Sequence, residues 1–472
     1  MTDWKKIPPC RWLDTEQQII ECVKYISTKP EVSYDTESSG LDLTKDYPLM
    51  FSLSDGVERF GAMADVLHHS VMKNYLETVP RLIGSNLPID IHWAANVGIN
   101  ITADIWNSVT MDWLYDENRE GRHGLKDCAL DYCGLQMRDF KEVFPFQRAT
   151  KTHAADTAKD AILRKISTPE GLTDAKQYAG LDPYANWHVA DYLKKKLQSI
   201  DCYPLTYNSD GTVNRWTLWD YYLAIEVPFA RVLYNLERRG IALSTGYLKQ
   251  LEVVAKKKID SIEAEFMKMT GENINLRSPA QLKKFFFGKL GKPLIERKKG
   301  NPDSVDEKAI KIWVNQGDKF AAKLQEHRKI SKLYSTYIKG LQEDVSPDGR
   351  IRSTLRGHTV SGRLNSNGPN LQNIPVGEND IFGIRRAFIA PVNRVLLDAD
   401  FSQLELVILA HRSGDEKMIE AIEAGKDLHI FAVSRIYAYD YDYCKSIKDK
   451  ADSVGYPNLP FNERQIIDKR SS

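Results

Sequence analysis

The chain has 472 residues, of which 42% are hydrophobic and 27% are charged. This length predicts two to four domains, and the composition excludes a mainly disordered or collagen-like chain. The net charge of +1 conceals an asymmetry, because residues 1–205 carry −7 and residues 206–472 carry +8. Such a division fits a cation-binding module followed by a module that binds a polyanion, although chance and solvated helix faces give the same pattern.

The first ten residues lack the apolar core of a signal peptide, and no apolar run reaches the ~18–20 residues of a membrane helix. Six cysteines are too few for a disulfide scaffold. Cys128 and Cys133 have no second pair, which argues against a structural zinc site. We therefore expect a protein of a reducing, cytosol-like compartment with no membrane partner.

Strand-like and helix-like patterns alternate over the first 200 or so residues, which predicts an α/β domain. A strand-like run at residues 32–34 leads into an acidic turn with Asp35 and Glu37. Residues 50–53 and 82–83 resemble the next strands, and Pro88 suits the first turn of a helix.

Three acidic patterns punctuate this region. Asp35 and Glu37 share a face if the chain there is extended, and two carboxylates on one side are costly without a cation. Asp90 follows a strand-like run, whereas Tyr178 and Asp182 are four residues apart and so share one face of a helix. Each pattern is weak alone, since most such acids are exposed and most such tyrosines belong to the core.

Together, D-x-E, N-x3-D and Y-x3-D in this order resemble the 3′–5′ exonuclease domain of the DEDD superfamily, specifically the DEDDy branch attached to family A DNA polymerases. The resemblance implies a ribonuclease H-like α/β fold and hydrolysis with two Mg²⁺ or Mn²⁺ ions per active site, for which hard oxygen ligands are suited. It implies that Tyr178 orients the attacking water and that the metal ligands are Asp35, Glu37, Asp90 and Asp182.

A turn-rich stretch at residues 199–216 is the expected domain boundary. Beyond it an amphipathic helix is predicted, ended by Gly271, with an apolar stripe at Leu251, Ala255, Ile259, Ile262, Phe266 and Met269. Ser278 with Pro279, and Ser304 with Glu307, are typical of helix starts. Residues 226–241, 275–282 and 332–337 resemble the start and the thumb of a family A polymerase.

Residues 361–364 and 369–375 closely match the family A segment that tracks the minor groove of primer–template DNA. Arg363, Asn370 and Gln372 would read the acceptors that every base pair presents there. The alternative interpretation is a polar turn capped by amides.

Residues 396–406 resemble motif A of the polymerase palm, an apolar strand that ends in an aspartate. The resemblance implies that Asp400 binds the two catalytic metal ions. It also implies that the incoming nucleotide is bound by Gln403, Glu405 and His429. Phe401 and Val407 stand where relatives usually carry Tyr and Arg.

The family pattern continues with a fingers helix and a second palm acid, neither of which follows Asp400 in this sequence. Residues 469–472 resemble the start of the fingers helix, with Arg464 as a second candidate. We therefore expect that this chain does not polymerise alone. We also expect its palm to expose apolar surface from about residue 380 on unless a C-terminal polymerase fragment completes it. An intron, an intein, a split gene or an incomplete record would each explain this pattern, and the short layout resembles phage replicases.

These features predict an exonuclease domain at 1–205, a lead-in to the polymerase domain at 206–240, a helical thumb at 241–345 and a partial α+β palm with the start of the fingers at 346–472. The predicted function is the N-terminal portion of a replicative DNA polymerase with proofreading, whose partners are primer–template DNA and dNTPs in the cytoplasm of a bacterial or phage-infected cell. A non-catalytic DNA-binding subunit or remnant is the alternative. An RNA-processing exonuclease is disfavoured by the polymerase-like motifs.

Overall fold

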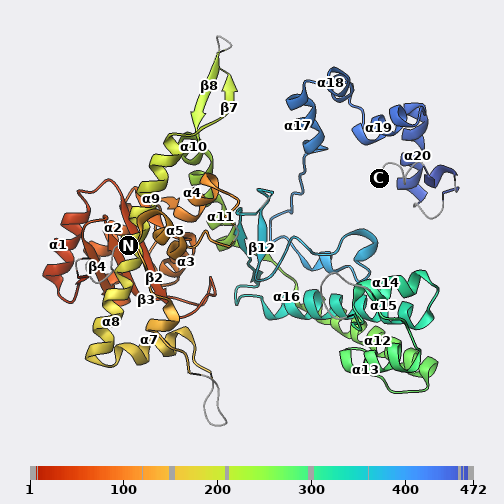
Figure 1. The fold of residues 1–472 in the computed structure, drawn as a ribbon, viewed down its shortest axis with the longest axis horizontal. Helices are drawn as coiled ribbons and strands as arrows, with labels where there is room; N and C mark the ends of the chain where they lie inside the picture. Colours follow the sequence, from red (N-terminus) through yellow and green to blue (C-terminus); the bar gives the residue numbers. More distant parts are fainter. Residues whose placement is uncertain are drawn as a thin grey trace. The chain divides into compact units, whose positions relative to one another are not determined.

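The computed structural model describes residue 7 and residues 9–119, 121–147, 155–207, 212–295, 302–359, 361–454, 459–460 and 462–465. The chain forms two compact units, residues 1–393 and residues 394–472 (Figure 1). None of the helices in the described residues is both long and apolar enough to cross a membrane.

A six-stranded mixed sheet with the order β1-β4-β3-β2-β5-β6 organises the N-terminal part. Strands β2, β3 and β4 pair antiparallel, β5 and β6 continue the sheet parallel to β2, and β1 runs parallel to β4. The strands are β1 (Arg11–Trp12), β2 (Val32–Ser38), β3 (Pro48–Ser54), β4 (Arg59–Met63), β5 (Arg81–Gly84) and β6 (Asp104–Asn107). The strands expected at residues 50–53 and 82–83 are confirmed, but residues 35–38 continue β2 rather than form an acidic turn.

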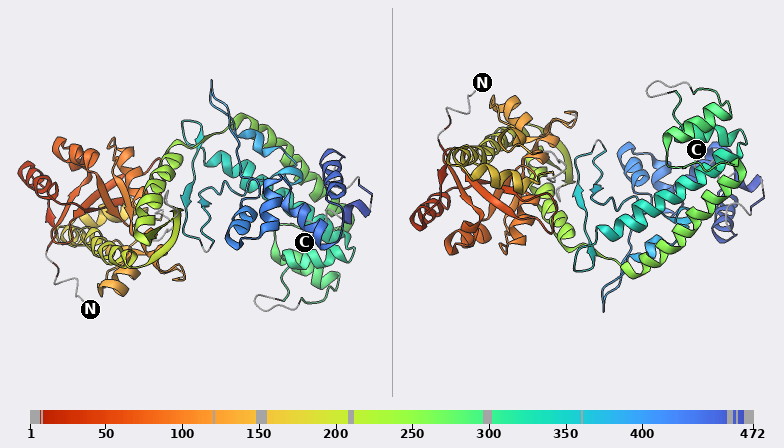
Figure 2. Two further views of the ribbon diagram at one scale, coloured as in Figure 1. Left: turned by 90° about the horizontal axis from the view of Figure 1, so that it is seen from above. Right: turned by 90° about the horizontal axis from the view of Figure 1, so that it is seen from below.

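Helices cover both faces of this sheet (Figure 2). One apolar core joins the sheet to α1, α2 and α3, and a second joins it to α4, α5 and α9. This arrangement agrees with the predicted α/β fold. The helices are α1 (Glu16–Ile26), η2 (Ala64–His68), α2 (Ser70–Thr78), α3 (Pro88–Asn96), α4 (Ser108–Tyr115), α5 (Leu125–Cys133), α6 (Phe140–Val143), α7 (Ala158–Ile166), α8 (Pro169–Ala179) and α9 (Leu181–Gln198).

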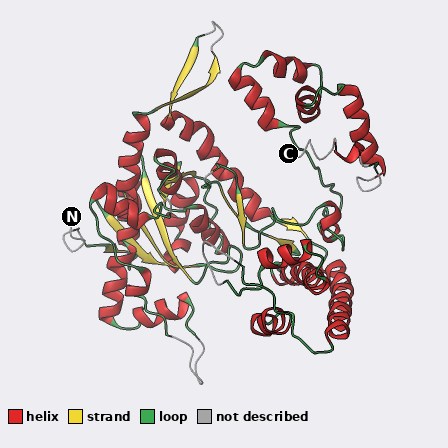
Figure 3. Ribbon diagram, turned by 45° about the vertical axis from the view of Figure 1, so that its right-hand side comes forward, coloured by secondary structure: helices red, strands yellow, loops and turns green. Residues whose placement is uncertain are grey.

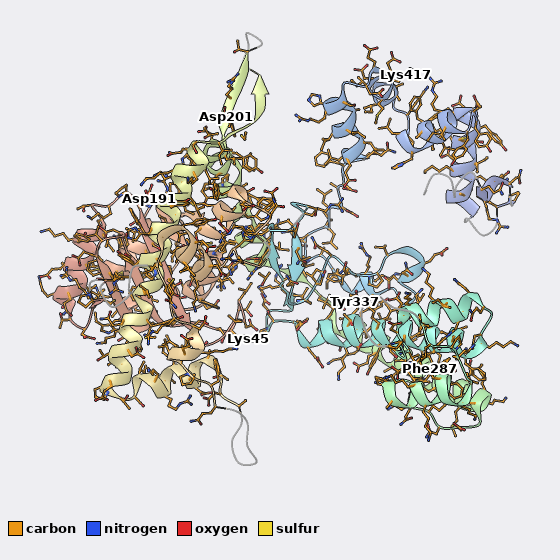
Figure 4. The ribbon with its side chains drawn as sticks, in the orientation of Figure 1. Lys45, Asp191, Asp201, Phe287, Tyr337 and Lys417 are labelled. Atoms are coloured by element: carbon orange, nitrogen blue, oxygen red, sulfur yellow. The ribbon has the colours of Figure 1, made fainter. Side chains whose placement is uncertain are left out.

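The expected boundary at residues 199–216 contains a β-hairpin, formed by β7 (Asp201–Tyr207) and β8 (Val213–Thr217). Asp201 marks its base in Figure 4. The predicted turn residues 208–211 lie outside the described residues. The hairpin is followed by α10 (Leu218–Tyr221), η3 (Tyr222–Glu226) and α11 (Val227–Arg239).

The described residues between 245 and 343 lie mostly in helices, in agreement with the helical pattern predicted beyond the boundary (Figure 3). The long helix α12 (Thr245–Thr270) ends at Gly271, whose φ of +70° favours glycine. The apolar stripe on α12 is buried except at its last member, Met269, which is 39% exposed near the end of the helix. The remaining helices are α13 (Pro279–Lys283), η4 (Lys284–Lys289), α14 (Glu307–Asn315), α15 (Lys319–Lys332), η5 (Leu333–Lys339) and α16 (Gly340–Glu343).

One predicted helix start is displaced. Ser278 caps α13 as expected, through its hydrogen bond from the Gln281 amide. At α14, however, the cap is Asp306 rather than Ser304, because the Asp306 side chain accepts from the Ala309 amide, so the helix begins two residues later than predicted.

The first unit also contains two short strand pairs. Strand β9 (Ile241–Ala242) pairs with β10 (Arg350–Ile351), and β11 (Thr354–Arg356) pairs with β12 (Asn365–Asn367), both antiparallel. Two 3₁₀ turns follow, η6 (Gly377–Asn379) and η7 (Ile384–Ala387).

The second unit contains the helices α17 (Leu404–Ser413), α18 (Glu416–Glu423), α19 (Leu428–Ile436) and α20 (Tyr441–Val454). The apolar strand expected before Asp400 is not formed, since residues 394–403 contain no strand. Leu397 is 89% and Phe401 77% exposed. A strand needs a hydrogen-bonded neighbour, and none of the described residues supplies one here.

Candidate active site

Two of the predicted site residues lie on the central strand β2. Asp35 and Glu37 are separated by one residue in an extended segment, so their side chains leave the same face of the sheet. Tyr34, which alternates with them, is fully buried in the apolar core on the sheet. The pairing of β2 with β3 becomes irregular between Glu37 and Ser38, so the acids sit where the regular ladder ends.

Asp90 is delivered by the first turn of α3. Pro88 starts this helix at a position where a missing amide proton is harmless. The Thr36 amide and the Thr36 hydroxyl both donate to Asp90 Oδ1, at 3.1 and 2.6 Å. Thr36 lies between Asp35 and Glu37, so these bonds tie Asp90 directly to the strand that carries the other acids.

Tyr178 and Asp182 come from two helices rather than from one helical face, which corrects the prediction. Helix α8 ends at Ala179 and α9 begins at Leu181. Pro183 explains the break, because a proline cannot donate to the carbonyl four residues earlier and its ring clashes with that group. That carbonyl, on Ala179, instead accepts from the Ser52 hydroxyl on β3 at 2.7 Å.

Close packing also fixes this junction. A Cβ atom at Gly180 would lie 2.5 Å from Cys10 Sγ, so only glycine fits beside the N-terminal segment. The turn between α8 and α9 is thereby pressed against the sheet, and it places both Tyr178 and Asp182 near the acids of β2.

The structure brings three of the four predicted metal ligands into one cluster. Asp35, Glu37 and Asp182 each offer a carboxylate oxygen, and these oxygens all lie within 4.8 Å of one another. Asp90 is not in this group of three, but its negative charge raises the pKa of both Asp35 and Glu37. The four acids are therefore electrostatic neighbours.

Burial and mutual repulsion make the ionised form of this carboxylate cluster unfavourable. The pKa values of Asp35 and Glu37 are raised well above their usual range, first by burial and then by Asp182 and Asp90. Burial also raises the pKa of Asp90 and of Asp182 to about 7. Among the described residues, Asp182 Oδ1 is buried without a hydrogen-bond partner.

These properties fit a divalent cation. A buried, unpartnered carboxylate oxygen among like charges is costly unless a positive charge compensates it. The donor set consists only of carboxylate oxygens, which suits hard cations such as Mg²⁺ and Mn²⁺. Asp35, Glu37 and Asp182 are the residues that could hold such an ion, with Asp90 beside them.

Tyr178 packs against two phenylalanine rings. The centroid of its ring lies 5.5 Å from that of Phe144 and 6.4 Å from that of Phe140, and both contacts are edge-on. The side chain is 4% exposed. Burial and then the charges of Asp182, Glu37 and Asp35 raise the pKa of its hydroxyl, so Tyr178 keeps its proton.

Sequence reasoning missed two residues of this site. Thr36 is one, and its place inside the D-x-E motif is the signal that points to it. The other is Lys126 on α5, whose positive charge lowers the pKa of Glu37 and Asp182. Its ammonium lies 2.9 Å from Asp139 Oδ1, next to the helix that carries Phe140. The signal that points to Lys126 is the run His123-Gly124-Leu125 before it, which resembles the H-x-L segment of such exonuclease domains but is a weak match by itself.

The predicted minor-groove residues lie in the loops around β12. Asn370 Oδ1 accepts from the Gln372 and Asn373 amides at 3.1 and 3.2 Å, and Gln372 Nε2 donates to the Leu364 carbonyl at 2.9 Å. These bonds shape the loop in the manner of amide-capped turns. Arg363 is exposed.

The predicted nucleotide-binding residues belong to the second unit. Asp400 is exposed in the segment without secondary structure, and Glu405 lies in the first turn of α17. Gln403, with a φ of +52°, accepts from the Leu428 amide at 2.9 Å, which places it beside the exposed His429 at the start of α19. Within the described residues, these side chains do not form a carboxylate cluster like that of the first unit. Arg464 is described, but residues 466–472, where the fingers helix was expected to start, lie outside the described residues.

Comparison with known proteins agrees with this division. Residues 10–198 match the family described as 3′-5′ exonuclease, and residues 245–452 match DNA polymerase family A. DNA polymerase I of Borreliella burgdorferi is 28% identical over 439 residues, which cover 90% of this chain and 44% of that protein. The thermostable DNA polymerase I of Thermus aquaticus is 36% identical over 222 residues, covering 47% of this chain and 27% of that protein.

A solved structure shows the same fold over most of the chain. The POL domain of Pol1 from M. smegmatis, in complex with DNA primer-template and dNTP, superposes with a TM-score of 0.69 at 22% identity, covering 98% of this chain and 76% of that one. The chain spans less than half the length of the curated relatives named above. The two family matches follow one another along the sequence, as the exonuclease-like sheet and the thumb-like helices do in the structure. This chain therefore combines a 3′–5′ exonuclease domain, at residues 10–198, with part of a family A DNA polymerase domain, at residues 245–452.

Proposed function

We propose that the N-terminal part of this chain removes nucleotides from the 3′ end of DNA by metal-assisted hydrolysis, and that the polymerase part extends primers with dNTPs as a portion of a replicative enzyme. The observation that carries the exonuclease proposal is the cluster of Asp35, Glu37 and Asp182, with a buried Asp182 oxygen that has no partner among the described residues. The domains proposed are 1–205, 206–240, 241–345 and 346–472.

Within the exonuclease site each side chain has a defined task. Asp35, Glu37, Asp90 and Asp182 would hold two Mg²⁺ or Mn²⁺ ions. When bound, such ions activate a water molecule and stabilise the departing oxygen. Thr36 keeps the Asp90 carboxylate aimed at β2 through its two hydrogen bonds.

Tyr178 and Lys126 act on the substrate side. Tyr178 keeps its proton at physiological pH, because burial and the neighbouring acids raise its pKa, so its hydroxyl orients the attacking water by a hydrogen bond. The positive charge of Lys126 lowers the pKa of Glu37 and of Asp182, and it would offset part of the negative charge of the DNA backbone.

For the polymerase part, we propose that Arg363, Asn370 and Gln372 contact the minor groove of primer–template DNA. Asp400 would bind the catalytic metal ions, and the incoming dNTP would meet Gln403, Glu405 and His429. The exposed apolar side chains between residues 394 and 409 favour further polypeptide, such as a C-terminal polymerase fragment, as the partner that covers them.

The direct test is digestion of 5′-labelled single-stranded DNA by the purified chain with Mg²⁺. We expect nucleotides to be removed from the 3′ end, and we expect the Asp35→Ala/Glu37→Ala double variant to lose at least about 10³-fold in rate, as loss of charge stabilisation at a catalytic centre does. Asp191→Ala is the matched control, because Asp191 lies on α9 with Asp182 but pairs with Lys195 at the surface (Figure 4). A wild-type chain that binds DNA without digesting it would favour the non-catalytic alternative.

A further inference from the structure

We propose that Glu237 is a positioning residue of the exonuclease site, which fixes helix α3 and with it Asp90 from outside the exonuclease domain. This inference rests on the proposed exonuclease function. Glu237 lies on α11, between residues 10–198 and residues 245–452 that the two families match. Neither matched region contains it.

Both oxygens of the Glu237 carboxylate are used, and they join two parts of the first unit. His92 Nε2 on α3 lies 2.9 Å from Oε2, and the Leu355 amide on β11 donates to Oε1 at 2.6 Å. The Glu237 side chain is 5% exposed and that of His92 is 1% exposed. A buried carboxylate is tolerated only when it is fully hydrogen-bonded, so the three groups hold one another in place.

Helix α3 depends on such outside contacts. Leu87, at its N-cap, provides no side-chain cap, and Asn86 before it has a φ of +63°, which is strained for a residue other than glycine. The helix is nine residues long, too short to be stable by itself. Its orientation is therefore set by tertiary contacts, which include those of Asp90 with Thr36, of His92 with Glu237 and of Asn96 with Arg238.

The two contacts act on different sides of α3. Asp90 and His92 are two positions apart, which is about 200° around a helix, so losing the His92 contact removes one restraint on rotation of the helix about its axis. At a side-chain radius of about 5–6 Å, a rotation of roughly 10° moves the Asp90 carboxylate by about 1 Å. A displacement of that size at a catalytic centre lowers the rate by up to about 10²-fold.

Helix α11 also offers a matched control. The Arg231 guanidinium donates to the carbonyls of Ile101 and Ala103, in the segment after α3. Arg231 thus helps to dock α11 on the exonuclease domain through the segment that follows α3. A change there tests the effect of weaker docking alone.

The experiment compares the full 472-residue chain with its Glu237→Ala, Glu237→Gln and Arg231→Ala variants. Two quantities are measured: kcat and KM for single-stranded DNA, and the affinity for Mn²⁺ without DNA by titration calorimetry. We expect Glu237→Ala to lower kcat at least about 10-fold with KM unchanged, and to weaken Mn²⁺ binding several-fold, because Asp90 is displaced. Glu237→Gln keeps one acceptor and the shape of the side chain, and we expect it to stay within about 3-fold of the wild type. Arg231→Ala should lower the unfolding midpoint but not kcat.

The outcomes separate this inference from the function on which it rests. A wild-type chain that digests DNA together with a Glu237→Ala variant of unchanged kcat and Mn²⁺ affinity would overturn the inference alone. So would equal losses of kcat in Glu237→Ala and Arg231→Ala, since Glu237 would then have only a structural role. A wild-type chain that does not digest DNA would overturn the proposed function, and the Mn²⁺ affinities would still decide whether Glu237 positions Asp90.

Discussion

Replacing Asp182 by Asn should stabilise the metal-free protein at alkaline pH while it abolishes the exonuclease. Burial raises the pKa of Asp182 from 3.8 to about 7, so the folded state resists ionising this group. Between pH ~4 and ~7 the folded protein binds more protons than the unfolded chain, and stability therefore falls as the pH rises through this window. Asparagine has nearly the same shape as aspartate but carries no charge, so the variant does not lose stability in this way as the pH rises.

The size of the stability gain in Asp182→Asn follows from the pKa shift of Asp182. One pKa unit corresponds to about 1.4 kcal/mol, so three units give an upper limit of roughly 4 kcal/mol at pH 8. Part of that free energy depends on the ionisation of the neighbouring acids. We therefore expect a gain of about 1–4 kcal/mol in the free energy of unfolding. At pH 5 less than half of it should remain, because Asp182 is then largely protonated in the folded wild type.

The assay is denaturant unfolding followed by tryptophan fluorescence, in EDTA at pH 5 and pH 8. Mg²⁺ should raise the stability of the wild type and close the gap, since a ligand of the native state stabilises it by mass action. Asp191→Asn on the same helix should show no such gain. An Asp182→Asn protein that is less stable than the wild type at pH 8 in EDTA, or a gain that does not depend on pH, would refute the electrostatic reasoning.

Three further predictions concern other parts of the chain. Thr36→Val removes the hydroxyl that donates to Asp90, and it should slow single-turnover digestion about 10-fold or more with little change in DNA affinity; an unaffected rate would mean that Asp90 needs no such anchor. Gly180→Ala should destabilise the protein by roughly 1–3 kcal/mol, because its Cβ would collide with Cys10, and Cys10→Gly should restore most of the unfolding midpoint if that collision is the cause. Limited proteolysis of the isolated chain should cut first within residues 394–402, which are exposed and contain no helix or strand; full protection of this segment would contradict the description of the second unit.

The acids of the exonuclease site were predictable because each lies in a short motif whose local geometry is simple. Asp35 and Glu37 share a face as soon as the chain is extended, and extending β2 to Ser38 leaves that conclusion intact. The break between Tyr178 and Asp182 was missed, although Gly180 and Pro183 were visible in the sequence. A spacing of four is compatible with one helix, and only the proline argument excludes it.

Contacts between distant residues set the limit of sequence reasoning. His92 and Glu237 are 145 positions apart. Glu237 lies in the run 226–241 that resembles the start of a polymerase domain, but that resemblance does not point to the exonuclease site. The strand expected before Asp400 failed for a related reason. Its apolar residues predict a strand in a complete sheet, but hydrogen-bonded neighbours decide whether a strand forms, and a single sequence segment does not contain them.

The central claim is that Asp35, Glu37 and Asp182 hold divalent cations, with Asp90 beside them. A crystal of the chain grown with Mn²⁺ and measured for anomalous scattering tests this most directly. We predict anomalous peaks within about 2.0–2.6 Å of carboxylate oxygens of these residues, which disappear in the Asp35→Ala/Glu37→Ala variant. Mn²⁺ bound only elsewhere, or four carboxylates that stay protonated and metal-free at pH 8, would contradict it.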